Sequence, residues 1–218
     1  MIKIAPSILS ANFANLAQQI KLVEKGGADW IHLDIMDGHF VPNITFGPMV
    51  VKAISNITKL PLDAHLMIQN PDKYLVDFKK AGTNRLTVHI EACIHLQRTI
   101  QRIRELGMKA GVSLNPATHI STMKEIFPYI DQVLVMTVNP GFGGQKFIKS
   151  TLRKIKDISV MIKDTSKKIE LEVDGGVDES NAGALAKAGA TVLVTGYSIF
   201  SKRNIPQAVK NIRQAAQS

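Results

Sequence analysis

The chain has 218 residues, of which 45% are hydrophobic, and its 27 lysines and arginines exceed its 18 aspartates and glutamates to give a formal net charge of +9 at pH 7. This length suits one large domain or two small ones, and the apolar share is that of a folded globular protein, which excludes disordered and fibrous chains. The sequence contains no run of about 18 mainly apolar residues, so we expect no membrane-spanning helix.

Eight short apolar runs typical of β-strands recur along the chain. They are residues 2–9, 30–36, 62–68, 86–90, 110–114, 132–138, 169–173 and 191–195. The stretches between them show helical spacing, and glycines at 26–27, 82, 107 and 189 mark several helix ends. Some runs, such as 133–136, are apolar almost throughout, which indicates a parallel sheet covered on both faces.

This alternation of strands and helices leaves two architectures, a doubly wound sheet or a closed barrel. Eight units favour the barrel, although 218 residues is compact against the usual length of about 250. No linker or low-complexity tract divides the chain. We therefore predict an α/β protein, a single (β/α)8 TIM barrel with a parallel eight-stranded core, as one catalytic domain over residues 1–218.

The N-terminal stretch and the cysteine content bear on the cellular compartment. Residues 4–9 are apolar but are interrupted by Pro6 and are too short for a signal-peptide core. The single cysteine, Cys93, cannot form an internal disulfide, which is typical of a reducing compartment. We expect a cytoplasmic protein.

The positive charge is concentrated in residues 145–168, which hold eight lysines and arginines against two aspartates, a net charge of +6. Three kinds of anionic partner therefore have to be considered: nucleic acid, a membrane surface and a phosphorylated metabolite. Apolar residues from Ile148 to Ile162 recur every three or four positions, which predicts an amphipathic helix with solvated lysines. Because aromatic residues make up only 6% of the chain, we favour this solvated face over a nucleic-acid surface.

Four polar residues lie on expected strands whose carboxyl ends would surround the catalytic centre of a barrel. His32 and Asp34 are two positions apart on the second run, so both side chains point to the same face. His65 lies in the third run, and Asp174 ends the seventh. Two imidazoles and two carboxylates suit Zn²⁺, Fe²⁺, Co²⁺ or Mn²⁺ better than Ca²⁺ or Mg²⁺. We predict one such divalent ion per subunit, in preference to four ordinary hydrogen-bonded core groups.

The remaining histidines are weaker candidates. His39 falls in an expected loop, and His95 and His119 fall near expected helix starts; all three are interpreted as surface or capping groups. His89 lies on the fourth run, where a hydrogen-bonded core histidine is favoured over a residue that supports the site.

Glycine-rich turns follow the last three strands. They comprise residues 139–144, Gly175 with Gly176, and Gly196. Glycine lets backbone N–H groups approach an anion closely, and barrel enzymes often bind phosphate at the loops after strands seven and eight. The three turns therefore predict one phosphate-binding cup.

Five blocks of sequence resemble the ribulose-phosphate 3-epimerase family, and the resemblance extends essentially from end to end. The blocks are APSILS at 5–10, HLDIMDGHFVPN at 32–43, DAHLM at 63–67, VNPGFGGQ at 138–145 and EVDGG at 172–176. The resemblance implies a metal-dependent (β/α)8 isomerase that interconverts D-ribulose 5-phosphate and D-xylulose 5-phosphate in the pentose phosphate pathway. Its partner would be a small phosphorylated sugar.

The resemblance also implies roles for single residues. The metal ligands would be His32, Asp34, His65 and Asp174, with Asp34 and Asp174 also the catalytic acid/base pair. Substrate contacts would come from Ser7, His65, Gly141, Phe142, Gly143, Gly144, Asp174, Gly175, Gly176, Gly196 and Tyr197, and Met36, Met67 and Met136 would pack near the reacting carbons. Where the family usually has Gly-Ser-Ala, this chain has Gly196-Tyr197-Ser198. A backbone contact to phosphate survives that change, whereas a hydroxyl contact would require Ser198.

These roles imply proton transfer at C3 by two aspartates through a metal-stabilised enediolate. A 3-epimerase of a hexulose 6-phosphate, such as allulose 6-phosphate, is the alternative within the class. Related decarboxylases and aldol-type synthases would require an Asp-x-Lys-x-x-Asp motif, whereas residues 32–37 contain no lysine. An inactive RNA-binding or scaffold barrel is disfavoured because all four expected ligands are present. The native metal and a homo-oligomeric state are left open.

Overall fold

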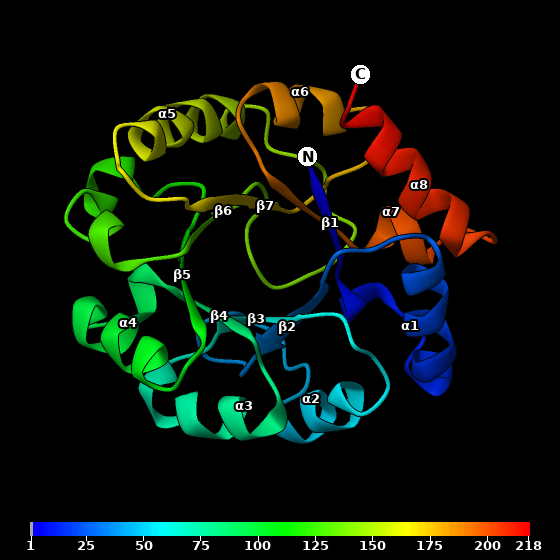
Figure 1. Ribbon diagram of the computed structural model, residues 1–218, viewed down its shortest axis with the longest axis horizontal. Helices are drawn as coiled ribbons and strands as arrows, with labels where there is room; N and C mark the ends of the chain where they lie inside the picture. The colour runs from blue at the N-terminus through cyan, green and yellow to red at the C-terminus, as the bar shows by residue number, and fades with distance from the viewer. Residues whose placement is uncertain (1) are drawn as a thin grey trace.

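In a computed structural model that describes residues 2–218, eight parallel strands form the centre of the protein. The strands are β1 (Lys3–Pro6), β2 (Ile31–Met36), β3 (Leu62–Met67), β4 (Arg85–His89), β5 (Lys109–Leu114), β6 (Gln132–Met136), β7 (Glu170–Asp174) and β8 (Val192–Thr195). Their hydrogen-bonded order is β1-β8-β7-β6-β5-β4-β3-β2. Figure 1 shows the strands enclosed by a ring of helices, which confirms the predicted (β/α)8 barrel.

The helices that cover the strands are α1 (Leu16–Lys25), α2 (Pro48–Ser55), α3 (Leu75–Ala81), α4 (Leu96–Glu105), α5 (Thr151–Lys163), α6 (Ala182–Lys187), α7 (Tyr197–Phe200) and α8 (Ile205–Ala215). Helix α5 is the predicted basic helix, and its Ile155 and Ile158 are buried. The expectation of a regular helix after every strand is wrong between β5 and β6. That connection holds two 3-10 helices, η5 (Ile120–Met123) and η6 (Phe127–Tyr129), because Pro128 has no N–H to donate and interrupts helical geometry.

The first predicted strand run is also too long. Strand β1 stops at Pro6, and Ser7 accepts a hydrogen bond from the backbone N–H of Leu9 at the start of the 3-10 helix η1 (Ile8–Ser10). A side-chain acceptor at this position caps the helix and ends the extended backbone. Three further 3-10 helices, η2 (Phe13–Asn15), η3 (Pro71–Lys73) and η4 (Ile90–Ala92), follow β1, β3 and β4.

Successive side chains of a strand point to opposite sides of the barrel wall. On β2, Leu33 and Ile35 face outwards and belong to the large apolar core shared with the helices. The alternate residues His32, Asp34 and Met36 point into the barrel and are also buried. All six residues of β2 are buried, which confirms the expectation of a sheet covered on both faces.

The barrel closes along a seam, which we define as the line where β1 and the segment after it meet β2. Instead of a regular ladder, the described residues there form a parallel bridge between Ser7 and His32. A hydrogen bond of 2.9 Å from the N–H of Asp29 to the carbonyl of Ile4 adds to it. The seam therefore places two of the predicted site residues side by side.

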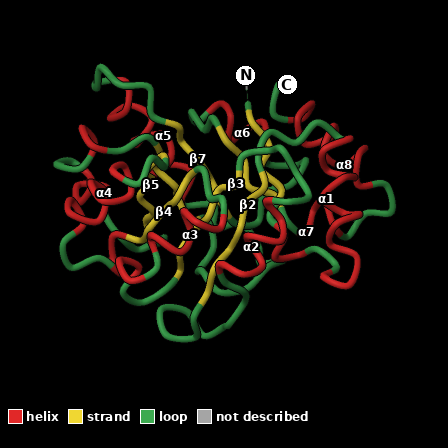
Figure 2. Tube along the Cα trace, turned by 60° about the horizontal axis from the view of Figure 1, so that its bottom comes forward, coloured by secondary structure: helices red, strands yellow, loops and turns green. Residues whose placement is uncertain are grey.

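The two ends of the chain meet on one side of the barrel. Arg213 of α8 donates to the carbonyl of Ile2 at 2.8 Å and to Oδ2 of Asp29 at 2.7 Å. Figures 1 and 2 both show α8 beside α1, at the edge of the molecule. Within residues 2–218, no helix is long and apolar enough to cross a membrane.

Candidate active site

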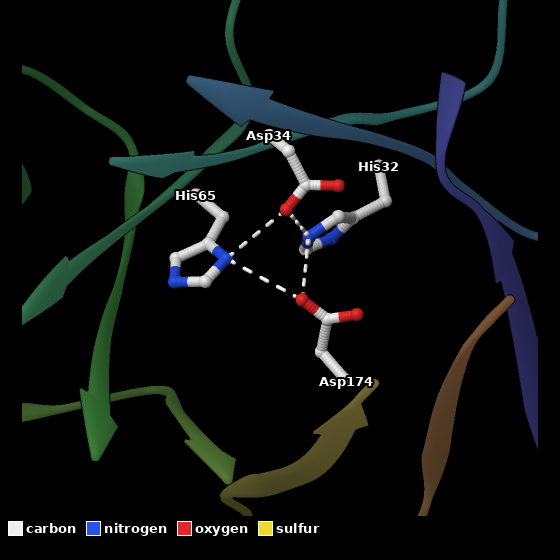
Figure 3. A group of neighbouring side chains, drawn as sticks. All are labelled: His32, Asp34, His65 and Asp174. Atoms are coloured by element: carbon white, nitrogen blue, oxygen red, sulfur yellow. Dashed lines mark ion pairs between the residues drawn. The ribbon is translucent and has the colours of Figure 1, made fainter. Parts of the chain in front are cut away.

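Four predicted ligands, His32, Asp34, His65 and Asp174, converge inside the barrel (Figure 3). Their nearest ligand atoms all lie within 4.8 Å of one another. Oδ1 of Asp34 lies 3.4 Å from His32 Nε2 and 3.4 Å from His65 Nδ1. Oδ2 of Asp174 lies 3.9 Å and 3.6 Å from the same two nitrogens. The register explains this proximity, since Asp34 pairs with His65 across β2 and β3.

Two buried nitrogen atoms at this centre lack a hydrogen-bond partner. They are Nε2 of His32 and Nδ1 of His65, and both face the two carboxylates. A buried polar atom without a partner is costly unless it binds a ligand. Two imidazole nitrogens and two carboxylate oxygens form a donor set suited to a borderline divalent metal ion, so the residues present fit such an ion.

The other nitrogen of His32 is held by a carboxylate that the sequence interpretation missed. Nδ1 lies 2.9 Å from Oδ2 of Asp63 and 3.5 Å from Oε1 of Glu172, and all three residues are fully buried. Burial lowers the pKa of the His32 imidazole, but the charge of Asp34 and hydrogen bonds to the surrounding carboxylates raise it well above the ordinary value. Burial and the charge of Asp63 raise the pKa of Glu172 to about 8. This shift favours the protonated form of Glu172, which relieves repulsion between the two carboxyl groups.

Asp34 is fixed on both sides. The hydroxyl of Ser7 donates to Oδ2 of Asp34, and Thr45 donates to the Asp34 carbonyl at 2.7 Å. Burial raises the pKa of the Asp34 carboxyl, but the charge of His32 and hydrogen bonds from His32 and His65 outweigh burial and place it far below the ordinary value. Asp34 is therefore an ionised carboxylate at neutral pH, available to accept a proton.

A cavity of about 600 Å³ opens over this centre. Ser7, Asp34 and Asp174 lie at its base together with the side chains of Met36, Met67 and Met136. His32 and His65 are fully buried and are not among the described residues that line the cavity. The expected substrate contact of His65 accordingly stays a prediction, whereas the other ten expected contact residues all line the cavity.

The glycine turns form the opposite wall of the cavity. Gly175 and Gly176 have φ angles of 117° and 65°, which residues with a side chain rarely adopt. A Cβ on Gly176 would also lie 2.5 Å from the backbone nitrogen of Phe147. Lys146 and Lys149 also line this cavity. Glycine turns allow backbone N–H groups to approach an anion closely, so these turns beside two cations suit an anion such as phosphate.

The residues that depart from the family pattern lie at the mouth of the cavity. Tyr197 is 65% exposed, and its ring approaches Gly144. The hydroxyl of Ser198 donates to the carbonyl of Val177 at 2.7 Å. Because that proton is already used within the protein, Ser198 is not poised to replace a serine that donates to phosphate.

The histidines outside the predicted ligand set lie at the surface or in the core as expected, but one of them also contacts a predicted ligand. His39 and His95 lie at the surface, and Nδ1 of His119 accepts from the N–H of Ser121 as a cap of η5. His89 is buried as expected, but its Nε2 lies 2.8 Å from Nε2 of His65. It thus contacts a predicted ligand, and only the pairing of β3 with β4 brings the two rings together.

Comparison with known proteins places the chain in a family. Residues 3–200 match the model of the ribulose-phosphate 3 epimerase family. The ribulose-phosphate 3-epimerase of Bacillus subtilis is 56% identical over 98% of this chain and 99% of its own length. The chloroplastic ribulose-5-phosphate-3-epimerase of Arabidopsis thaliana is 50% identical over 96% of this chain and 75% of its own.

Solved structures agree on the fold. The crystal structure of KGPDC from Streptococcus mutans has a TM-score of 0.73 over 100% of this chain and 98% of that one, at 12% identity. At such low identity the likeness concerns the barrel alone. The sequence relationships go further: the chain is a member of the ribulose-phosphate 3-epimerase family, a family of isomerases.

Proposed function

We propose that this protein is a metal-dependent epimerase that interconverts D-ribulose 5-phosphate and D-xylulose 5-phosphate, a step of the pentose phosphate pathway. The observation that carries the proposal is the convergence of Asp34 and Asp174, from β2 and β7, on two buried imidazole nitrogens without partners. The cavity above them has methionines at its base and glycine turns on one wall. This combination suits a small sugar with a phosphate at one end.

His32, Asp34, His65 and Asp174 would hold the metal ion, with Zn²⁺, Fe²⁺, Co²⁺ and Mn²⁺ as the candidates. When bound, such an ion supplies electrostatic stabilisation of the negative charge that develops on the substrate oxygens. The hydrogen bond from His32 to Asp63 orients the ring so that Nε2 faces the site.

Epimerisation at C3 requires one proton acceptor and one proton donor on opposite faces of a planar enediolate. In the ribulose-to-xylulose direction Asp34 takes the C3 proton and keeps it, and Asp174, protonated at the start, donates its own proton to the other face. Figure 3 shows the two carboxylates approaching from opposite sides of the histidine pair. In the reverse direction their roles exchange.

The other cavity residues position the substrate. The hydroxyl of Ser7 donates to Asp34 and lies at the cavity surface, within reach of a bound sugar. Met36, Met67 and Met136 exclude water from the reacting carbons, which protects a reactive intermediate. The turns at residues 141–144, 175–176 and 196–197 bind the phosphate.

A coupled assay for D-xylulose 5-phosphate tests the proposal. We expect turnover of D-ribulose 5-phosphate by the protein as isolated, loss of turnover after chelation, and recovery on addition of one or more of Zn²⁺, Fe²⁺, Co²⁺ and Mn²⁺. Turnover that survives complete metal removal, verified by elemental analysis, would contradict the metal dependence.

The same assay with allulose 6-phosphate addresses the alternative substrate class. A pentose phosphate should give the larger kcat/KM. A larger value for the six-carbon ketose phosphate would reassign the substrate while leaving the two-aspartate mechanism in place.

The single cysteine supports a reducing compartment, and we propose a cytoplasmic location. Of the partner classes considered, a phosphorylated sugar has support from the cavity.

A further inference from the structure

A chain of hydrogen bonds leads away from His65 through two residues that the mechanism above does not use. Nε2 of His65 lies 2.8 Å from Nε2 of His89, and Nδ1 of His89 lies 3.1 Å from Oε2 of Glu91. His89 ends β4 and is fully buried, and its ring lies nearly parallel to that of His65, with an interplanar angle of 23° and a centroid distance of 4.9 Å. Glu91 follows in η4.

Glu91 is held rigidly by the loop after β5. Its Oε1 accepts from the backbone N–H of Asn115 at 2.8 Å and from the hydroxyl of Thr118. Lys154 of α5 in turn donates to three backbone carbonyls of this loop. Burial raises the pKa of Glu91, but hydrogen bonds from His89, Thr118 and Asn115 lower it to about 2. Glu91 is therefore a carboxylate, which accepts hydrogen bonds and donates none.

The Glu91 carboxylate determines which nitrogen of His89 and which nitrogen of His65 carries the proton. With one proton on each ring, His89 must donate its Nδ1–H to Glu91, which leaves a lone pair on its Nε2. That lone pair accepts the Nε2–H of His65. Nδ1 of His65 is then left with a lone pair, and this is the atom that faces Asp34 and Asp174 without a hydrogen-bond partner.

We propose that His89 and Glu91 are positioning residues that select the tautomer of His65 in which Nδ1 is free to bind the metal ion. This inference rests on the metal site of the proposed function. When its ring carries a single proton, His32 reaches the same state by direct contact with Asp63, at 2.9 Å. The proton position is thus set differently on the two imidazoles of the site. On His32 a carboxylate sets it directly, and on His65 a carboxylate sets it through the intervening His89.

The first test is a ¹⁵N NMR measurement of the histidine side chains in the metal-free protein at alkaline pH. The proposal requires a protonated Nε2 and an unprotonated Nδ1 on His65, and a protonated Nδ1 on His89. The reverse assignment on either ring would overturn it. This measurement needs no variant, so it does not depend on whether a substitution is tolerated.

The second test is Glu91→Gln, with Zn²⁺ affinity measured by competition with a chromophoric chelator. The glutamine side-chain oxygen can still accept hydrogen bonds from Asn115 and Thr118, while its amide N–H donates to Nδ1 of His89. The proton of His89 then moves to Nε2, and the proton of His65 moves from Nε2 to Nδ1. We expect Zn²⁺ affinity to fall about 10–100-fold and the ¹⁵N pattern to reverse or to become mixed. Glu125→Gln removes the same charge from an exposed position and should change neither.

The outcomes separate the inference from the function on which it rests. If the unsubstituted protein binds no divalent metal, the proposed metal site itself is wrong. If that protein binds Zn²⁺ and folded Glu91→Gln binds it equally well with an unchanged ¹⁵N pattern, only the role of His89 and Glu91 is refuted.

Discussion

The two aspartates of the site occupy different surroundings although they project towards the same pair of imidazoles. The Asp34 side chain is 5% exposed and accepts a hydrogen bond from Ser7, whereas the Asp174 side chain is 14% exposed at the end of β7. A carboxylate that must protonate and deprotonate a carbon in turn benefits from access to the bound substrate. Both carboxylates line the cavity and therefore have this access.

Substitution of one aspartate tests this pair directly. Asp174→Asn keeps the shape of the side chain but cannot move the proton, so we expect kcat to fall by at least about 100-fold, the lower end of general acid/base contributions. Steady-state kinetics should be measured at matched metal content, because Asp174 is also a proposed ligand. Near-normal kcat with metal bound would remove Asp174 from the mechanism.

Much of the site could be predicted from single residues, and the missed residues have physical reasons. His32 and Asp34 share a face because of the two-residue period of a strand, and the same period relates Asp63 to His65 and Glu172 to Asp174. That signal was available for the two missed carboxyl groups. The contact between His65 and His89 depends instead on strand register, which local sequence does not specify.

At the scale of elements, close packing inside the barrel depends on one glycine of β5. A Cβ on Gly111 would lie 2.2 Å from Oγ1 of Thr87 on the neighbouring strand β4. The register places these two residues opposite each other. The absence of a side chain at Gly111 therefore allows Thr87 to fill the barrel interior.

Gly111→Ala should lower the free energy of unfolding by about 1–3 kcal/mol, the usual cost of overpacking a core. Thr87→Ala removes the clashing hydroxyl, so the double variant should be less destabilised than the sum of the two single changes. Urea unfolding of all four proteins measures the coupling. Strict additivity would show that the clash is not the cause.

An ion pair fastens β7 to β1 at the amino-terminal end of the barrel. Lys3 donates to Oε1 of Glu170, and Thr191 donates to Oε2 at 2.8 Å. Burial raises the pKa of Glu170, but the hydrogen bonds from Lys3 and Thr191 and nearby positive charge hold it below the ordinary value of 4.5. The folded protein therefore binds this proton less readily than the unfolded chain.

Because the folded pKa is the lower one, the stabilisation from Glu170 is complete above about pH 4.5 and is lost as the pH falls through the folded value. Glu170→Gln should reduce stability at pH 7 by about 1 kcal/mol, a modest figure for a partly exposed charged pair. Urea unfolding should show the difference shrinking below pH 4.5. A difference that is independent of pH would exclude the charge as its source. Glu105→Gln, at an exposed pair on α4, is the control.

The fold was predictable element by element where the pattern was periodic. All eight strands lie within one or two residues of the predicted runs except at the end of β1, where capping by Ser7 competes with extension. The connection from β5 to β6 was misjudged because its apolar residues suggested a helix that Pro128 does not permit. The local pattern of apolar residues thus mispredicts secondary structure where a helix cap or a proline changes the backbone conformation.

At the scale of the whole molecule, we propose that residues 1–218 form one cooperative unit. Trp30, the single tryptophan, is 6% exposed in the barrel interior with Ala5, Val192 and Val194. The guanidinium of Arg85 lies 4.2 Å from its ring centroid. Its fluorescence therefore reports on β1, β2, β4 and β8 together.

Fluorescence of Trp30 and far-UV circular dichroism should give the same midpoint in urea, because the strands that surround it belong to both ends of the chain. A second transition seen by circular dichroism after the fluorescence change is complete would show two independent units. Scattering measurements at each concentration would control for aggregation.

The pairing of β1 has a consequence for how the enzyme is made. Strand β1 forms its ladder with β8, the last of the eight strands in chain order, and among the described residues it meets β2 through the limited contacts of the seam. Ser7 follows β1 directly and donates to Asp34, and it gains the support of the β1–β8 ladder only after β8 has emerged from the ribosome. A nascent chain can therefore carry all four proposed metal ligands while β1 still lacks the strand with which it forms its ladder.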